Sequence, residues 1–172
     1  METVCMFADI SGFTKVGEAC AAKGVRGNEE LAFCINRYME GMCRNLGKYG
    51  GDIIKFVGDA MIIMWPQPEN VPEADRRENA QFTCRKAIQC AIDIQKEMNN
   101  FQVIQGVASL SVKIGIGFGK CALLYVGGVF GRAEYFTVGP SLTCALKSEE
   151  QATEGGQIIV NSSAYQHVRD FY

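Results

Sequence analysis

The chain has 172 residues, of which 48% are hydrophobic and 21% are charged, and its formal net charge at pH 7 is −2. This profile is typical of one globular domain with a full core and excludes a disordered or fibrous chain. The small negative charge argues against a general nucleic-acid-binding protein. No apolar run approaches the roughly 20 residues that span a bilayer, and the N-terminus lacks the basic flank of a secretory signal.

The eight cysteines lack the spacing of a metal site. They include no CxxC pair, and His167 is the single histidine. Most of them fall on the apolar phase of predicted helices or strands, so we interpret them as small, reduced core residues of a cytoplasmic protein. A disulfide or metal role is the weaker alternative. A soluble domain of a larger, membrane-associated protein is a further alternative.

The first half of the chain predicts a strand, a helix, a hairpin and a second helix. Residues 3–10 read as a buried strand, and residues 28–48 keep helical spacing of their apolar side chains. Residues 52–65 form two apolar runs that are interrupted by Gly58 and Asp59, which predicts a hairpin with Asp59 at its tip. Residues 79–101 predict a second long helix with one apolar stripe.

The second half continues the alternation. Residues 109–131 read as two strands joined by a glycine-rich turn, 135–139 as a short strand, 140–152 as a helix opened by a proline, and 156–161 as a further strand. This order predicts an α+β fold, a ferredoxin-like split βαβ sandwich. Its sheet should be mainly antiparallel, with helices packed on one face.

Two acids, Asp9 and Asp59, each stand at the end of an apolar strand. Aspartate is common in tight turns, so turn chemistry explains either residue alone. In a split βαβ sheet, however, the first strand lies beside the hairpin, and both carboxylates can reach the same edge. Two carboxylates repel one another unless a cation lies between them, and hard oxygen ligands of this kind suit Mg²⁺.

The turn that follows Asp9 adds a second feature. Residues 11–14 read Ser-Gly-Phe-Thr, so the backbone N–H groups around Gly12 are not covered by a bulky side chain. A helix that begins there directs its positive end at an anion. Carboxylates for a metal beside amides for phosphate predict a nucleoside triphosphate site.

Three blocks of sequence carry a resemblance to a known family. FADISGFT (7–14), GGDIIKFVGDAMIIMW (50–65) and VKIGIGFGKCALLYVGG (112–128), in this order and spacing, resemble the catalytic domain of class III nucleotidyl cyclases. The first catalytic half of the soluble, bicarbonate-responsive adenylyl cyclases is especially similar. The resemblance runs from about Thr3 to Asn161. It implies that residues 1–172 are a single cyclase catalytic domain, and we expect this domain to be a fragment of a longer protein.

The resemblance also implies a reaction and a set of site residues. Asp9 and Asp59 would hold two Mg²⁺ ions (Mn²⁺ is an alternative), with the Ile10 carbonyl as a further ligand. Lys113 would contact the triphosphate, although a solvent-facing strand lysine is an equal alternative from the sequence alone. The β and γ phosphates would be held by the backbone amides of Ser11, Gly12, Phe13 and Thr14. The ribose 3′-hydroxyl of ATP would attack the α-phosphorus, giving 3′,5′-cyclic AMP and pyrophosphate by a two-metal mechanism.

Members of this family work as dimers, in which one half of the dimer binds the metals of a pocket and the other half supplies its base-reading and transition-state residues. The second of these residue sets is incomplete in this chain. Lys55 fits the base-reading lysine, but Phe136 stands where a polar base reader is expected. Thr143 replaces an asparagine and Lys147 replaces an arginine. Lysine is a poor substitute for the planar guanidinium that braces a developing phosphorane. We therefore expect the chain to supply the metal-binding half of a pseudo-symmetric dimer with a second cyclase domain, from the same or another chain.

Three alternatives remain at this level. Lys55 follows the adenine-type pattern, which favours ATP, but a guanylyl cyclase is not excluded. The weak second half also fits a non-catalytic cyclase-like module for regulation or dimerisation. In a pseudo-symmetric pair, Lys55 would line the second pocket, where the soluble relatives bind bicarbonate, but Leu146 replaces the arginine that shares this task there.

Overall fold

The computed structural model describes residues 1–68, 70–104 and 108–172. Its strands are β1 (Glu2–Ser11), β2 (Asp52–Val57), β3 (Ala60–Pro66), β4 (Phe101–Ile104), β5 (Ala108–Lys120), β6 (Ala122–Gly127), β7 (Ala133–Val138) and β8 (Ile158–Val160). Its helices are α1 (Phe13–Ala21), α2 (Val25–Tyr49), α3 (Arg76–Met98), α4 (Pro140–Glu149) and α5 (Ser162–Tyr165), with short 3₁₀ turns η1 (Glu73–Asp75) and η2 (Val129–Gly131).

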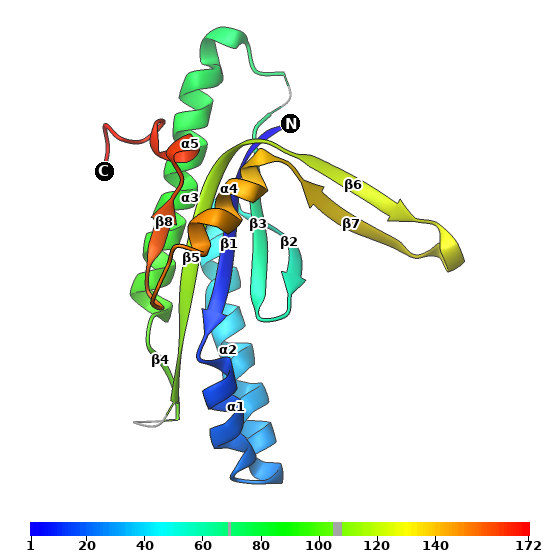
Figure 1. Cartoon of the computed structure of the whole chain (residues 1–172), viewed down its shortest axis with the longest axis vertical. Helices are drawn as coiled ribbons and strands as arrows, with labels where there is room; N and C mark the ends of the chain where they lie inside the picture. The colour runs from blue at the N-terminus through cyan, green and yellow to red at the C-terminus, as the bar shows by residue number, and fades with distance from the viewer. Residues whose placement is uncertain (69, 105–107) are drawn as a thin grey trace.

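The main sheet has the strand order β2-β3-β1-β5-β4, and β8 pairs with β5 (Figure 1). All pairings along this path are antiparallel, and the β5–β8 pairing is parallel. This confirms the α+β fold with a mainly antiparallel sheet. β6 and β7 form a separate hairpin that projects away from the sheet (Figure 1).

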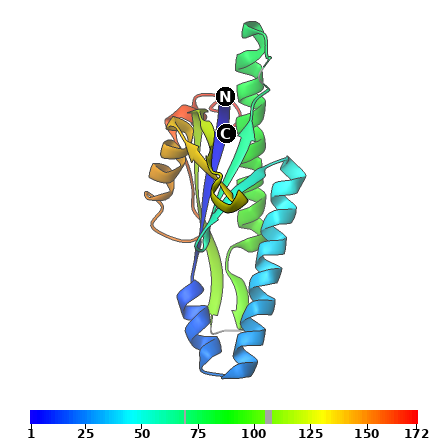
Figure 2. The same cartoon turned by 90° about the vertical axis from the view of Figure 1, so that its right-hand side faces the viewer.

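Successive side chains of β1 point to opposite faces of the sheet. Val4, Met6, Ala8 and Ile10 belong to the large core formed with α2 and α3. Cys5 and Phe7, on the other face, belong to a smaller core that includes residues of α4. The long helices α2 and α3 thus share one face, as the sequence predicts. The prediction that the helices pack on one face does not hold for α4, which lies on the opposite face (Figure 2).

The backbone of α4 can approach β5 because β5 presents glycines on this face. A Cβ atom on Gly115 would lie 2.1 Å from the Ala145 carbonyl oxygen, and one on Gly117 would lie 2.6 Å from the Ser141 carbonyl oxygen. Both distances are shorter than any normal contact, and the atoms met are backbone atoms. The glycine-rich stretch therefore serves helix packing within a strand, and the strand pair predicted over 109–131 is divided at Cys121 into β5 and β6.

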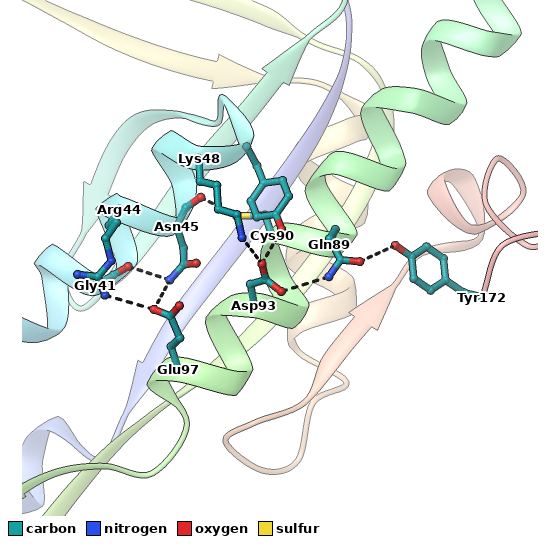
Figure 3. A network of polar contacts seen from close by, with 10 residues as sticks. Gly41, Arg44, Asn45, Lys48, Gln89, Cys90, Asp93, Glu97 and Tyr172 are labelled. Atoms are coloured by element: carbon teal, nitrogen blue, oxygen red, sulfur yellow. Dashed lines mark hydrogen bonds and ion pairs between the residues drawn. The ribbon is translucent and has the colours of Figure 1, made fainter.

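Helices α2 and α3 are joined by a polar network centred on Asp93 (Figure 3). Lys48 Nζ lies 2.7 Å from Asp93 Oδ2, and the Tyr49 hydroxyl donates to the same oxygen at 2.5 Å. Gln89 Nε2 donates to Asp93 Oδ1 at 3.2 Å, and the hydroxyl of Tyr172 donates to Gln89 Oε1 at 3.4 Å. The network therefore connects the C-terminal end of α2, the C-terminal half of α3 and Tyr172.

All eight cysteines are free thiols. Five of them are buried, at positions Cys5, Cys20, Cys84, Cys90 and Cys121, in agreement with the prediction that most serve as small core residues. Burial raises the pKa of the Cys84 thiol to about 12, so this thiol stays protonated. Over the part of the chain that the structure describes, no helix combines the length and the apolar character needed to cross a membrane.

Candidate active site

Asp9 lies on the central strand of the sheet, on the face that α4 covers. It stands opposite Ala60 of β3 on one side and opposite Lys113 of β5 on the other. Most of the apolar residues of β1 that precede it, Ala8 among them, are buried and fix this position. The Asp9 side chain remains 29% exposed, so its carboxylate is open to a ligand.

Asp59 lies next to Asp9 in the sheet, at the turn between β2 and β3. The β1–β3 ladder ends at the pair Asp9–Ala60, and Asp59 is the residue immediately before Ala60. Asp59 is exposed. The structure thus brings the backbone positions of Asp9, Ile10 and Asp59 to the same edge, as the split βαβ topology predicts. Their role as metal ligands stays a prediction.

The turn after β1 leads directly into α1. The first intrahelical hydrogen bond runs from the Val16 amide to the Gly12 carbonyl, and no side chain caps the helix. The amides of Phe13 and Thr14 therefore have no acceptor within the helix and are available to an anion. Gly12 has φ 95°, and a Cβ atom there would lie 2.4 Å from the Ser109 carbonyl oxygen, so this turn requires glycine.

A hollow of about 530 Å³ adjoins this turn. Ser11, Gly12 and Thr14 line it on one side and Ser109 and Ser111 of β5 on the other. Neither Asp9 nor Asp59 is among the described residues that line it. The phosphate cradle at residues 11–14 stays a prediction.

Lys113 connects the strand edge to α4. Its Nζ lies 3.4 Å from Asp9 Oδ2 and 2.6 Å from Glu149 Oε1. The hydrogen bond to Glu149 and, to a smaller extent, the one to Asp9 raise the pKa of Lys113, although partial burial opposes the shift. The side chain is 24% exposed, so Lys113 is a partly buried cation beside the predicted metal ligands and not a solvent-facing strand lysine.

The donors at this edge fit Mg²⁺ in number and chemical type. Mg²⁺ is usually held by one or two carboxylates and keeps several water molecules, which matches Asp9, Asp59 and the Ile10 carbonyl. A closed site of the zinc type needs about four nitrogen or sulfur ligands. Within residues 1–68, 70–104 and 108–172, no group of three or more histidine, cysteine, aspartate or glutamate residues comes together in this way.

The residues predicted for the second pocket lie elsewhere. Lys55 of β2 pairs with Glu134 of β7, with Nζ 3.0 Å from Oε2, and its ammonium lies 4.9 Å from the centre of the Phe136 ring. Thr143 and Lys147 are both exposed on α4, one turn apart. The Thr143 hydroxyl donates to the Gly139 carbonyl at 3.2 Å. The structure therefore brings Lys55 of β2 and Phe136 of β7 together. Thr143 and Lys147 lie on a different element, helix α4.

Comparison with known proteins decides the family. A family model described as the adenylate and guanylate cyclase catalytic domain matches residues 1–172. The chain belongs to this family. Adenylate cyclase type 10 of Rattus norvegicus is 28% identical over 167 residues, which are 95% of this chain and 10% of that protein. Adenylate cyclase type 10 of Oryctolagus cuniculus is 31% identical over 126 residues, 72% of this chain and 7% of that protein.

Solved cyclase structures share the fold. The adenylyl cyclase CyaB from P. aeruginosa matches with a TM-score of 0.77 at 26% identity, covering 99% of this chain and 81% of that chain. The guanylate cyclase domain of RhGC from Catenaria anguillulae, solved in complex with GTP, matches with a TM-score of 0.72 at 20% identity, covering 98% and 82%. The resemblance seen in the three sequence blocks is thus confirmed, although the chain spans about a tenth of the length of its curated relatives.

Two charged residues of the cyclase domain were not singled out from the sequence. Glu149 is the near partner of Lys113, and Glu134 is the partner of Lys55. Glu134 precedes Phe136 by two residues, so the period of a strand places both on one face of β7. Glu149 follows Ala145 by four residues, and this helical spacing places it on the buried side of α4, where it is one of few charged residues.

Proposed function

We propose that this cyclase domain supplies the metal-binding half of an adenylyl cyclase site and converts ATP to 3′,5′-cyclic AMP and pyrophosphate. One observation carries the proposal. Asp9 pairs with Ala60 of β3, and Asp59 immediately precedes Ala60 in the β2–β3 turn, beside a helix whose first amides have no acceptor within the helix. Metal ligands and a phosphate cradle at one sheet edge are what cyclisation of a nucleoside triphosphate needs.

Asp9, Asp59 and the Ile10 carbonyl would hold Mg²⁺. When bound, the metal lowers the pKa of the ribose 3′-hydroxyl and neutralises charge on the phosphates. The chain itself binds and orients the substrate. The uncapped amides of Phe13 and Thr14 receive the terminal phosphates, and the charge of Lys113 lies beside them. Because little covalent chemistry falls to the protein, positioning and electrostatics dominate the rate.

The proposal includes a second cyclase domain. The β6–β7 hairpin exposes a run of large apolar side chains, namely Leu124, Tyr125, Val126, Val129, Phe130, Tyr135, Phe136 and Val138. So many exposed large apolar side chains on one projecting hairpin are typical of a protein interface. The exposed Thr143 and Lys147 lack the chemistry of the asparagine and arginine that the resemblance expects. A partner domain would supply these groups to the pocket that Asp9 and Asp59 begin.

ATP is the proposed substrate and GTP the alternative. Lys55 offers a donor and Glu134 an acceptor, and these groups could pair with the edge of either purine. In a pseudo-symmetric pair, however, Lys55 and Glu134 line the pocket that lacks Asp9 and Asp59. The partner domain therefore recognises the base in the catalytic pocket. The ion pair with Glu134 also occupies the lysine that would otherwise bind a bicarbonate ion. The free thiols are suited to a reducing compartment, and we therefore place the domain in the cytoplasm.

The test is a cyclase assay of the purified protein mixed with a second cyclase domain that carries the missing asparagine and arginine. It uses ATP and GTP, in Mg²⁺ and in Mn²⁺, with the cyclic product identified by mass spectrometry. We expect cyclic AMP from the wild type and a loss of at least about 10²-fold in Asp9→Asn and Asp59→Asn. The matched control is Glu40→Gln, which removes an exposed acid of α2 and should keep wild-type activity.

Each other outcome has a definite meaning. If the protein prefers GTP, the proposed substrate is wrong, but the proposed role of the chain as the metal-binding half of the site stands. Wild-type activity in both aspartate variants would reject Asp9 and Asp59 as metal ligands. An inactive wild type that still forms a stable dimer, with no binding of Mn²⁺, would favour the non-catalytic module.

A further inference from the structure

Lys113 is shared unequally between two carboxylates. Its Nζ lies 2.6 Å from Glu149 Oε1 and 3.4 Å from Asp9 Oδ2. The Glu149 side chain is only 9% exposed, whereas that of Asp9 is 29% exposed. The lysine thus belongs mainly to the buried carboxylate and only partly to the acid that we propose as a metal ligand.

Stability alone does not explain a carboxylate at position 149. Glu149 is the last residue of α4, where the negative end of the helix dipole disfavours an acid. Burial of a carboxylate costs free energy, and a buried ion pair seldom stabilises a fold more than an apolar pair of the same volume does. The arrangement therefore calls for a different explanation.

The backbone fixes Glu149 beside Lys113. Gly115 lies two residues after Lys113 and faces the same helix, and a Cβ atom there would lie 2.4 Å from the Glu149 amide nitrogen. The missing side chain lets the end of α4 rest directly on β5. The carboxylate is held by this close packing and not by a long flexible segment, so it can define where the lysine ammonium lies.

We propose that Glu149 is a positioning residue of the cyclase site, which holds Lys113 away from Asp9 so that Asp9 stays available to a divalent cation. This inference rests on the proposed function, because it needs Asp9 to bind the metal. Without Glu149, Asp9 becomes the remaining ionic partner of Lys113, and an ammonium paired with Asp9 competes with the cation for the same oxygens. With Glu149, the charge of Lys113 stays beside the site without occupying it.

Binding of Mn²⁺ without nucleotide tests this role independently of activity. Free Mn²⁺ is measured by electron paramagnetic resonance in titrations of the wild type and of Glu149→Gln. We expect the dissociation constant to rise about tenfold in Glu149→Gln, the lower end of what loss of an outer partner of a metal ligand costs. Glu150→Gln is the control, because it removes the neighbouring, exposed carboxylate of the same helix end and should leave the constant within twofold.

A double-mutant cycle separates positioning from simple charge. If Glu149 acts through Lys113, the change Glu149→Gln should alter Mn²⁺ binding less than twofold in a Lys113→Met background. An equal weakening in both backgrounds would mean that only the charge of Glu149 matters, and the inference would be wrong. Glu149→Asp is the second variant. It keeps the charge but shortens the reach to Lys113, so we expect partial weakening, whereas wild-type affinity would contradict positioning.

The outcomes for this inference and for the proposed function differ. If the wild type does not bind Mn²⁺, or if Asp9→Asn binds as well as the wild type, then both proposals fail. If Asp9→Asn abolishes binding while Glu149→Gln binds as the wild type does, only the role of Glu149 is rejected. Thermal unfolding of each variant shows whether a change in binding comes from loss of the fold.

Discussion

Asp9 and Lys113 stand directly opposite one another across the β1–β5 ladder, with Lys113 Nζ 3.4 Å from Asp9 Oδ2. The pairing sets a predicted metal ligand and a predicted phosphate ligand side by side on neighbouring strands. The Lys113 ammonium therefore lies on the same protein surface as the predicted metal ligands.

The first prediction concerns Lys113. Replacement by methionine in Lys113→Met keeps the length of the side chain but removes a charge that we propose to lie beside the substrate phosphates. We expect kcat/KM for the nucleotide to fall about 10²-fold, which is the usual cost of losing one such electrostatic contact. Steady-state assays at saturating Mg²⁺ measure this. Lys96→Met, which removes an exposed charge at the end of α3, serves as the control. An equal loss of kcat/KM in Lys96→Met would show that the effect is not specific to Lys113.

The second prediction concerns the network in Figure 3. The hydrogen bond from Lys48, with smaller contributions from Tyr49 and Gln89, lowers the pKa of Asp93 to about 2 from an ordinary 3.8. A depressed folded-state pKa stabilises the fold above the ordinary value, and this contribution is lost as the pH falls toward 2. We expect Asp93→Asn to lower the free energy of unfolding by about 1–2 kcal/mol near neutral pH.

The pH dependence is the discriminating measurement. Urea unfolding between about pH 7 and about pH 2 should show the difference between Asp93→Asn and the wild type shrinking below about pH 4. Glu40→Gln, which removes an exposed acid of the same helix pair, should follow the wild type at every pH. If the difference in the free energy of unfolding is the same at every pH, the charge of Asp93 does not stabilise the contact between α2 and α3.

The positions of Asp9 and Asp59 could be predicted because they follow from topology. Asp9 stands at the end of a buried strand and Asp59 lies at the tip of a hairpin. A split βαβ sheet places this strand beside the hairpin, so the two acids reach the same edge. The partner of Lys113 could not be predicted with the same ease. The contact with Glu149 depends on how closely α4 crosses β5, and that distance is set by Gly115 on a different element.

The second pocket illustrates the other limit. The family resemblance predicts a base reader at the position of Phe136, and the Phe136 ring does lie beside Lys55. The carboxylate that meets Lys55 belongs to Glu134, two residues earlier on the same face of β7. A family motif predicts a single residue position, whereas every second side chain of a strand lies on the same face and can reach the pocket.

The helix predicted over residues 28–48 begins earlier in the structure, at Val25, because Gly24 with φ 68° ends the preceding turn.

The third prediction tests the close packing of α4. In Gly115→Ala the new methyl group would meet the Ala145 carbonyl oxygen and the Glu149 amide, which are backbone atoms that cannot rotate away. We expect a loss of about 1–3 kcal/mol of stability, together with weaker metal binding because Glu149 is displaced. Gly47→Ala is the matched control. That glycine lies in α2 with nothing near its Cβ position, so alanine should stabilise the protein slightly.

The fourth prediction tests the β6–β7 hairpin as the contact with a second cyclase domain. Phe130 is 97% exposed and adopts a left-handed conformation with φ 55°, which asparagine tolerates better than phenylalanine. Phe130→Asn should therefore leave the free energy of unfolding of the isolated domain unchanged or slightly higher. If the hairpin forms the interface, the same change should weaken association at least about tenfold, since large aromatic side chains carry much of the binding energy at interfaces.

Sedimentation velocity over a range of concentrations measures this association. Phe82→Ser is the control, because it removes an exposed aromatic side chain from α3, away from the hairpin, and should not change the association constant. Cyclase activity per domain should fall in parallel with association in Phe130→Asn and recover at high concentration, because only the partner is lost. Unchanged association would show that the partner domain contacts another surface, and activity that stays low at saturating concentration would show that Phe130 acts within the pocket.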